Sequence, residues 1–225
     1  MPERPRYALV TLLAYNELLR LKVGACPIRS GEFLTPCGQS VIVCSYQEFS
    51  KLTCVPLEKI SLYGRLEDGF SVFDVSECRT MIFYNAERYT QRVRFTLIHE
   101  VGHIICHHKR NAPVEEAEAN LFASQFLMPS AVILEIIRRG HCLDAHKLCR
   151  VFDVSTAAAN IKLSQLQRNP HTLTHLDSAI ISRFTPYLDQ YFPPKLSPFS
   201  HACHFYGSIE NYRAFQKLED DTLFP

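Results

Sequence analysis

Several patterns that define other classes of protein are missing from this chain. Its 24 Lys and Arg residues balance 23 Asp and Glu residues, and the net charge of +1 argues against a broad nucleic-acid-binding surface. The nine cysteines are odd in number and include no Cys-x-x-Cys pair. We therefore expect free, buried thiols in a reducing compartment.

Long hydrophobic runs are also missing. The apolar run at residues 8–13 is too short to cross a bilayer, and the opening residues MPERPRY lack a signal-peptide cleavage pattern. We therefore expect a cytoplasmic protein without a membrane segment. With 225 residues, of which 47% are hydrophobic, the chain can bury a substantial core.

The stretch His-Glu-Val-Gly-His at residues 99–103 carries the most specific chemistry in the chain. In a helix, His99 and His103 lie one turn apart on the same face, so one metal ion fits between their rings. Imidazole nitrogen is a good zinc ligand, and Glu100 lies beside the pair, within reach of a water molecule on an open metal position. The motif therefore predicts a zinc-dependent hydrolase.

A helix is predicted around this motif, over residues 90–108. Thr90 suits the cap position at its start, and no proline interrupts it. Apolar residues recur at helical spacing on a side away from the histidines, so one face is predicted to lie in the core and the other on a metal cleft. His107 continues the histidine face but lies two turns from His99. We expect it to support the ligands by hydrogen bonding, or to be solvated at the helix end, rather than to bind the ion.

A third protein ligand is expected, because catalytic zinc commonly has three. The segment VEEAEANLFASQFLMP, residues 114–129, predicts a second helix that begins with acidic residues and ends at a proline. Geometry alone leaves Glu115, Glu116 and Glu118 open as the third ligand. Glu116 and Asn120 form an i, i+4 pair on one face of this helix.

Two linked segments, RFTLIHEVGH and EAEANLFASQFLMP, resemble the ImmA/IrrE family of metallopeptidases. That family combines a HExxH helix with a Glu-x-x-Ala-Asn-x-Phe-Ala segment that ends in Leu-Met-Pro. The resemblance is sharp over roughly residues 80–130 and weak beyond about residue 168. It implies a thermolysin-like site with Zn²⁺ bound by His99, His103 and Glu116, with Glu100 as the general base. Asn120, one turn after Glu116, is expected to support the ligands.

The resemblance also implies a function. It predicts an endopeptidase that uses metal-activated water to cut one specific regulatory protein, such as a helix-turn-helix transcriptional repressor, including one of a mobile element. Glu100 would take a proton from the water and pass it to the leaving amine. The donor to the oxyanion stays open among Tyr84, Tyr89, His107, His141 and Tyr206. The alternative is a zinc-containing regulatory protein that binds protein or DNA through its C-terminal half without proteolysis.

The predicted fold class is α+β. A helix is expected over residues 7–22, and strands are expected at 41–46, 69–75 and 80–85, of which the last two form a hairpin. A small, mainly antiparallel sheet would pack on the HExxH helix and on the second ligand-bearing helix, with a helical C-terminal extension. In the metallopeptidases that this chain resembles, a sheet edge beside the cleft holds the substrate backbone. We expect residues 80–85 to form that edge.

Three regions are predicted: a zincin-like core over residues 1–135, a helical extension over 136–168, and an aromatic, proline-rich segment over 169–225. The extension contains a turn that resembles a helix-turn-helix unit and is mildly basic, with Lys147, Arg150, Lys162 and Arg168. DNA binding is thus possible, but packing on the core is the favoured role. Prolines of the last segment, including Pro186, are expected to break helices, while its aromatic residues favour folding against the core or a partner.

Overall fold

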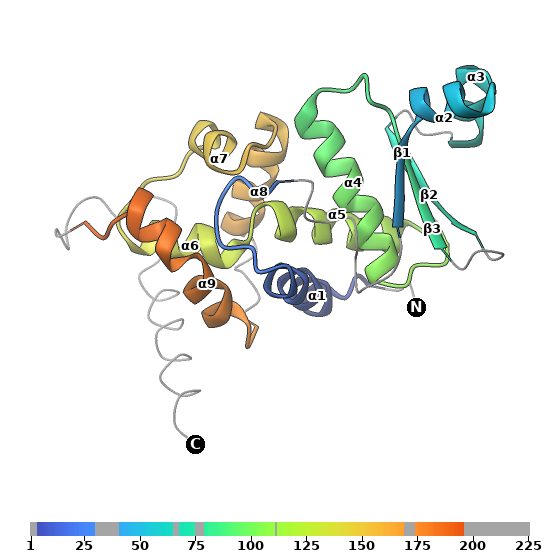
Figure 1. The fold of residues 1–225 in the computed structure, drawn as a ribbon. Coiled ribbons are helices and arrows are strands. Elements are labelled where there is room, and N and C mark those ends of the chain that lie inside the picture. Colours follow the sequence, from blue (N-terminus) through green and yellow to red (C-terminus); the bar gives the residue numbers. More distant parts are fainter. Residues whose placement is uncertain are drawn as a thin grey trace.

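The computed structural model describes residues 4–29, 41–64, 68–74, 79–110, 112–168 and 174–195. These residues form nine helices and one three-stranded sheet (Figure 1). The strands are β1 (Val41–Ser45), β2 (Gly69–Asp74) and β3 (Arg79–Tyr84). The helices are α1 (Tyr7–Arg20), α2 (Tyr46–Thr53), α3 (Leu57–Gly64), α4 (Thr90–Ile105), α5 (Pro113–Leu127), α6 (Ser130–Arg138), α7 (Ala145–Phe152), α8 (Thr156–Arg168) and α9 (Asp177–Tyr191).

The sheet has the strand order β1-β3-β2. β2 and β3 are antiparallel, as the predicted hairpin requires, and β1 runs parallel to β3 because α2, α3 and β2 intervene before the chain returns. The predicted α+β class, with a small sheet packed on helices and a helical C-terminal region, is confirmed. The expectation that residues 80–85 form a sheet edge is wrong, because β3 is bonded on both sides. The edge next to the helix of the histidine motif is β2.

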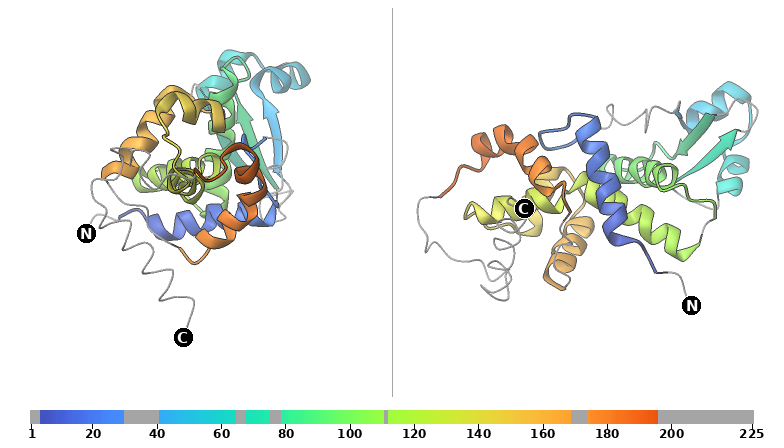
Figure 2. Two further views of the ribbon diagram at one scale, coloured as in Figure 1. Left: turned by 90° about the vertical axis from the view of Figure 1, so that its left-hand side faces the viewer. Right: turned by 90° about the horizontal axis from the view of Figure 1, so that it is seen from below.

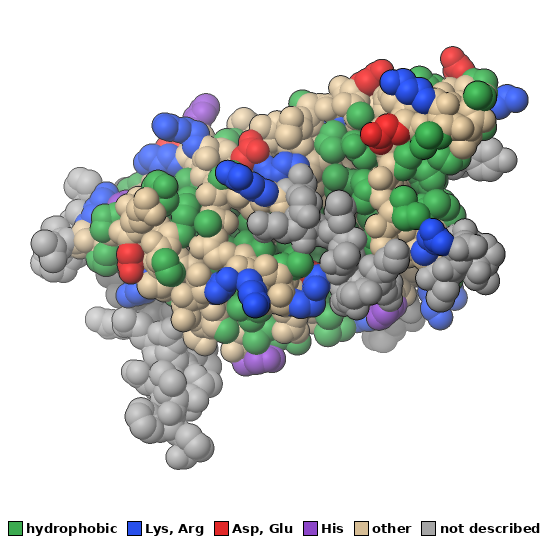
Figure 3. All heavy atoms as spheres, in the orientation of Figure 1, with side chains coloured by type: hydrophobic (Ala, Val, Ile, Leu, Met, Phe, Trp, Pro, Cys, Tyr) green, Lys and Arg blue, Asp and Glu red, His purple; other side chains and the backbone are tan. Residues whose placement is uncertain are grey.

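Helices cover both faces of the sheet (Figures 1 and 2). α2 and α3 close one face through a small cluster in which Tyr46, Ile60 and Phe83 are buried. On the other face, Ile82 of β3 and Ile98 of α4 are fully buried in the main core. Alternate residues of β3 thus serve two different cores, as the two-residue period of a strand dictates. Hydrophobic side chains also reach the surface over the strands and over α2 and α3 (Figure 3).

Helix α4 is shorter at its end than the sequence predicts. It stops at Ile105, and His107 has a φ of 55°, in the left-handed region that ends many helices. At its start, Tyr89 occupies the cap position without a side-chain cap hydrogen bond, so the prediction that Thr90 caps the helix is wrong. Thr90 is instead the first helical residue, where its own backbone is already helical.

Helices α4 and α5 pack closely because Gly102 lacks a side chain at their contact. A Cβ atom built on Gly102 would lie 3.1 Å from Cβ of Phe122, which is fully buried in α5. Helix α1 lies across α5 on its other side (Figure 2), where Val10, Ala14 and Leu18 are fully buried. The two helices of the linked motifs therefore lie side by side in the centre of the core.

The C-terminal helices pack against the same core. Arg94 of α4, itself buried, donates to the carboxylate of Asp153 at 2.7 Å and so ties the turn between α7 and α8 to the motif helix. Lys162 of α8 is 2% exposed and donates to Gln125 of α5 at 3.2 Å. The turn that resembles a helix-turn-helix unit thus packs against α4 and α5.

The expectation that Pro186 breaks a helix is wrong. Pro186 lies inside α9, where it removes one backbone hydrogen bond. Ile180, Phe184 and Leu188 of the same helix are fully buried against the main core. Their burial stabilises the helix despite the proline, since most helical stability in proteins comes from packing of an apolar face.

Two further expectations concern the thiols and the membrane. Five cysteines, Cys26, Cys44, Cys54, Cys106 and Cys149, are free thiols, but Cys142 is disulfide-bonded, so the expectation of free thiols fails there. Pairing depends on which residues folding brings together, and spacing along the sequence does not reveal it. In the described part of the chain, no single helix is both long and apolar enough to cross a membrane; the bent pair α5 and α6 reaches that length only together.

Candidate metal centre

The two histidines of the motif point their Nε2 atoms at the same place. His99 and His103 lie one turn apart on α4, and their Nε2 atoms are 3.1 Å apart. Both side chains are largely buried, at 15% and 13% exposed. Burial lowers the pKa of His99 and lowers that of His103 to about 4, an effect to which the neighbouring histidines add. Both rings are therefore neutral near pH 7, the form that binds a metal ion.

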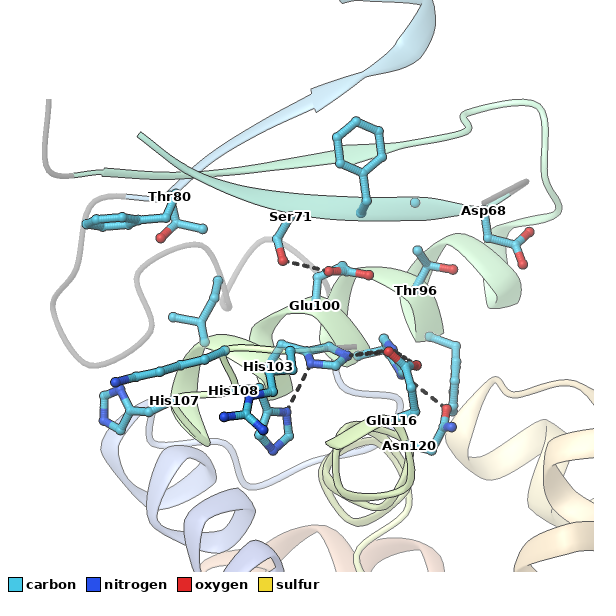
Figure 4. Close-up of a pocket in the computed structure, with 18 of the residues that line it drawn as sticks. Asp68, Ser71, Thr80, Thr96, Glu100, His103, His107, His108, Glu116 and Asn120 are labelled. Carbon is cyan, nitrogen blue, oxygen red and sulfur yellow. Dashed lines mark hydrogen bonds and ion pairs between the residues drawn. The ribbon is translucent and has the colours of Figure 1, made fainter. Parts of the chain in front are cut away.

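Helix α5 brings Glu116 to these two nitrogen atoms. Its Oε2 atom lies 3.3 Å from His99 Nε2, and its Oε1 atom lies 3.4 Å from His103 Nε2. His99, His103 and Glu116 are the residues of the described chain whose ligand atoms gather closely enough to hold a metal ion. Figure 4 shows Glu116 beside the His103 ring, with Asn120 one turn further along α5.

The separations between the ligand atoms are close to those expected around a zinc ion. Bonds of about 2.0–2.1 Å at tetrahedral angles place neighbouring ligand atoms about 3.3 Å apart. The two Nε2 atoms are 3.1 Å apart, Oε2 of Glu116 lies 3.3 Å from Nε2 of His99, and Oε1 of Glu116 lies 3.4 Å from Nε2 of His103, so each nitrogen has a carboxylate oxygen at about the expected separation. Two neutral imidazole nitrogens and one carboxylate oxygen also form a donor set that zinc accepts. The residues present therefore fit the ion that the sequence predicts.

Asn120 holds His99 from behind. Its Oδ1 atom lies 3.1 Å from Nδ1 of His99, so it accepts the Nδ1 proton and leaves the Nε2 lone pair free for a metal ion. This contact agrees with the supporting role expected of Asn120, which stays a prediction. The i, i+4 spacing that puts Glu116 and Asn120 on one face explains why one helix supplies both contacts.

His108, not His107, lies behind the second histidine. Its Nδ1 atom is 3.0 Å from Nδ1 of His103, and its side chain is only 3% exposed. The prediction of His107 extended the helix through residue 108, but α4 ends at Ile105 and the left-handed residue at 107 redirects the chain. His107 instead lines the cleft in front of the metal site.

Glu100 faces β2 from α4. The hydroxyl of Ser71 donates to its Oε2 atom at 2.7 Å (Figure 4). Burial raises the pKa of Glu100 to about 7; the nearby charge of Glu116 adds to this rise, whereas the Ser71 hydroxyl and backbone N–H oppose it. Sequence reasoning missed Ser71. Its one signal is a polar residue in the otherwise apolar strand GFSVF.

A cleft of about 1150 Å³ opens over these residues. β2 forms one wall with Gly69, Ser71 and Phe73, and α4 forms the other with Phe95, Thr96 and Ile104. Its floor carries His99, Glu100, His103 and Glu116. The cleft is thus bounded by a strand edge on one side and by the motif helix on the other, which suits an extended chain.

The five candidates for the oxyanion donor differ in whether they lie at the cleft. His107 lines the cleft, whereas Nε2 of His141 lies 2.8 Å from the main-chain carbonyl of Pro193 and donates to it. Tyr84 and Tyr89, both described, are not among the residues lining the cleft. Tyr206 lies outside the described residues. His107 is therefore the one of these five that the described structure keeps as a candidate.

Comparison with known proteins gives a family. Residues 58–164 match the model of the Peptidase_M78 family, described as an IrrE N-terminal-like domain. No curated protein shows a significant match to the chain. The matched residues include β2, β3, α4 and α5, and so every residue of the cleft floor. The chain thus carries an IrrE N-terminal-like domain of a metallopeptidase family, which confirms the resemblance to the ImmA/IrrE family that its motifs predicted.

Proposed function

We propose that this protein is a zinc-dependent endopeptidase that cuts a specific regulatory protein inside the cell. The observation that supports this most directly is that His99, His103 and Glu116 bring their ligand atoms close enough together to hold a metal ion, with Glu100 beside them on the cleft floor. The matched family is a metallopeptidase family, which agrees with a metal site and implies a protein substrate. Zinc is our choice among divalent ions because of the two imidazole ligands and the carboxylate.

The proposed chemistry divides between the ion and Glu100. A bound zinc ion supplies Lewis acidity, which lowers the pKa of water and polarises a peptide carbonyl. Glu100 accepts a proton from the attacking water and delivers it to the leaving amine, as a general base and then a general acid. Ser71 holds the carboxylate of Glu100 toward the cleft through its hydroxyl and its backbone N–H. His99, His103 and Glu116 would bind the ion and would take no part in proton transfer.

The edge of β2 is the proposed docking strand for the substrate. Asn85 N–H donates to the carbonyl of Asp68, so the alternation of an antiparallel ladder turns the backbone of Phe70 toward β3 and that of Ser71 and Phe73 away from it. Both residues line the cleft, and since the N–H of Ser71 bonds to Glu100, the carbonyl of Ser71 and the backbone of Phe73 are the groups proposed to pair with a peptide. An extended peptide that adds to this edge would cross the floor above Glu100.

The proposed substrate is a helix-turn-helix transcriptional repressor, and this choice rests on the family resemblance. DNA binding by the chain itself has less support. The α7–α8 region has four Lys and Arg residues. One of them, Lys162, is buried and hydrogen-bonded to Gln125. On the face shown in Figure 3, Lys and Arg side chains of the described residues are scattered among acidic and apolar ones.

The test compares the zinc-loaded protein with its Glu100→Gln variant. Both are first shown to bind one equivalent of zinc, since Glu100 is not a proposed ligand. Each is then incubated with a library of peptides derived from a bacterial proteome, and new peptide ends are identified by mass spectrometry. We expect a defined set of cuts with the wild-type chain and none with the variant. Identical peptide maps for both proteins would contradict the proposal.

A further inference from the structure

A chain of hydrogen bonds, buried at His108 and Glu118, runs from the metal site to Arg6, the residue before α1. Nδ1 of His103 lies 3.0 Å from Nδ1 of His108, and Nε2 of His108 lies 3.0 Å from Oε2 of Glu118. Glu118 in turn accepts three hydrogen bonds from Arg6: from the backbone N–H at 2.7 Å, from Nε at 3.0 Å and from Nη2 at 2.6 Å. The side chains of His108 and Glu118 are 3% and 2% exposed.

The direction of every proton in this chain follows from Glu118. Glu118 accepts the backbone N–H and the guanidinium N–H groups of Arg6, so its carboxylate is also the acceptor toward Nε2 of His108. Nε2 of His108 therefore donates to Glu118, and Nδ1 of His108 accepts when the ring carries a single proton. The atom that donates to it is Nδ1 of His103. With one proton on the His108 ring, these contacts are satisfied when His103 carries its proton on Nδ1 and its lone pair on Nε2.

That tautomer is the one that a metal ligand at this place requires. Nε2 of His103 is the atom that meets Nε2 of His99 and the carboxylate of Glu116. Without an acceptor behind Nδ1, the ring could carry its proton on Nε2 or rotate about its side-chain bonds, and either change removes a ligand from the site. Asn120 supplies the acceptor for His99 directly. His103 receives it through an intermediate histidine.

We propose that His108, Glu118 and Arg6 are positioning residues that fix His103 for the metal ion. This proposal rests on the proposed zinc site of His99, His103 and Glu116. It also gives a different role to Glu118, which sequence spacing left open as a third ligand, because its carboxylate faces away from the site, between His108 and Arg6. The hydrogen bonds between Arg6 and Glu118 span 112 residues of sequence. Arg6, which directly precedes α1, is thus linked to the metal site through the side chains of Glu118 and His108.

Zinc affinity is the measurement that tests this proposal, determined by competition with a chromophoric chelator. His108→Leu removes both hydrogen bonds, whereas His108→Gln keeps an amide oxygen to accept from His103 and an amide N–H to donate to Glu118. We expect the Leu variant to bind zinc about 10- to 100-fold more weakly, and the Gln variant to recover most of that loss. Nitrogen NMR of the metal-free wild-type protein should show the His103 proton on Nδ1.

Arg6→Gln gives a second variant at an exposed side chain, in case the buried changes prevent folding. We expect a smaller loss of zinc affinity, of a few-fold, because the backbone N–H of residue 6 still donates to Glu118. Arg4→Gln, at an exposed arginine two residues earlier, is the matched control and should bind zinc as the wild-type chain does. Thermal melting of each metal-free variant separates a loss of folding from a loss of ligand position.

The outcomes are distinguishable from failure of the metal site itself. A wild-type chain that binds no zinc overturns the site on which this proposal rests. A wild-type chain that binds zinc, together with a folded His108→Leu variant of equal affinity, overturns the positioning chain alone. Equal losses in the Leu and Gln variants also overturn it, because the volume of the ring rather than its hydrogen bonds would then decide the affinity.

Discussion

The hydroxyl of Ser71 donates a 2.7 Å hydrogen bond to Oε2 of Glu100, and so joins the edge strand β2 to the motif helix α4. Both residues line the same cleft. The strand proposed to receive a peptide backbone therefore also contacts the proposed general base. In the proposed function, peptide binding and proton transfer would thus be coupled through Ser71.

Replacing Ser71 tests that coupling. We expect Ser71→Ala to reduce kcat for peptide hydrolysis by roughly tenfold or more, because a hydrogen bond to a charged group contributes about 1.5–3 kcal/mol. Ser71→Thr keeps the hydroxyl and should retain most of the rate. Zinc affinity should be the same in all three proteins, since Ser71 touches no proposed ligand. A Thr variant as slow as the Ala variant would show that the hydroxyl is not what matters.

The identity of the third ligand is tested by neighbouring glutamates on α5. Glu116→Gln removes the charge that faces His99 and His103, and we expect zinc affinity to fall about 100-fold or more, beyond the 10- to 100-fold typical of supporting residues. Glu115→Gln is the matched control. Glu115 accepts from the backbone N–H groups of Lys109 and Arg110, and its replacement should leave zinc affinity within a few-fold of wild type. The reverse ranking would place the ligand on Glu115.

Lys162 predicts a pH dependence of folding. Complete burial lowers the pKa of Lys162 from 10.5 to about 7. Between pH 7 and 10.5 the unfolded chain thus holds a proton that the folded chain has released, so stability rises with pH in this window and the cost of burial is greatest below pH 7. The contribution is about 1.4 kcal/mol for each pH unit within the window.

Lys162→Met removes this group while keeping its volume. We expect the variant to be more stable than wild type near pH 7, and to lose the rise in stability between about pH 7.5 and 9.5, as measured by urea unfolding. Lys59→Met, at an exposed position on α3, serves as the control and should follow the wild-type pH profile. Parallel pH profiles for the wild-type and Lys162→Met proteins would show that the lysine does not titrate in this range.

Gly102→Ala tests the close approach of α4 and α5. The added Cβ would meet Cβ of Phe122 at 3.1 Å, so α5 must shift by a few tenths of an ångström. We expect a net destabilisation of about 1 kcal/mol, because overpacking costs about 1–3 kcal/mol and alanine returns up to about 1 kcal/mol of helix propensity. The shift also moves Glu116, so zinc affinity should fall. Unchanged stability together with unchanged zinc affinity would show that α4 and α5 accommodate the added methyl group without cost.

Periodicity and motif spacing predicted the elements that carry the site. The helices around His99 and Glu116 have long, regular apolar patterns, and the hairpin of β2 and β3 follows from two alternating runs separated by a short turn. The α+β class follows from these elements. Each of these signals is local, within a span of about 15 residues, and local signals are the ones that a single sequence displays.

Features set by tertiary contacts were not predictable in the same way. Strand order decides whether β2 or β3 is the edge, and it depends on where β1 joins the sheet. His108 replaces His107 because the helix ends three residues earlier than its pattern suggests. Ser71 and Arg6 reach their partners across 29 and 112 residues. Pro186 is tolerated because the apolar face around it is buried.

The link between Arg6 and Glu118 has a practical consequence for working with fragments. The family match begins at residue 58, so a fragment cut to the matched residues would lack Arg6 and the whole of α1. Glu118 would then keep His108 but lose the guanidinium of Arg6, and a buried carboxylate that has lost its cation is costly. Expression and tagging should therefore preserve the residues that precede α1, even though they lie outside the recognisable domain.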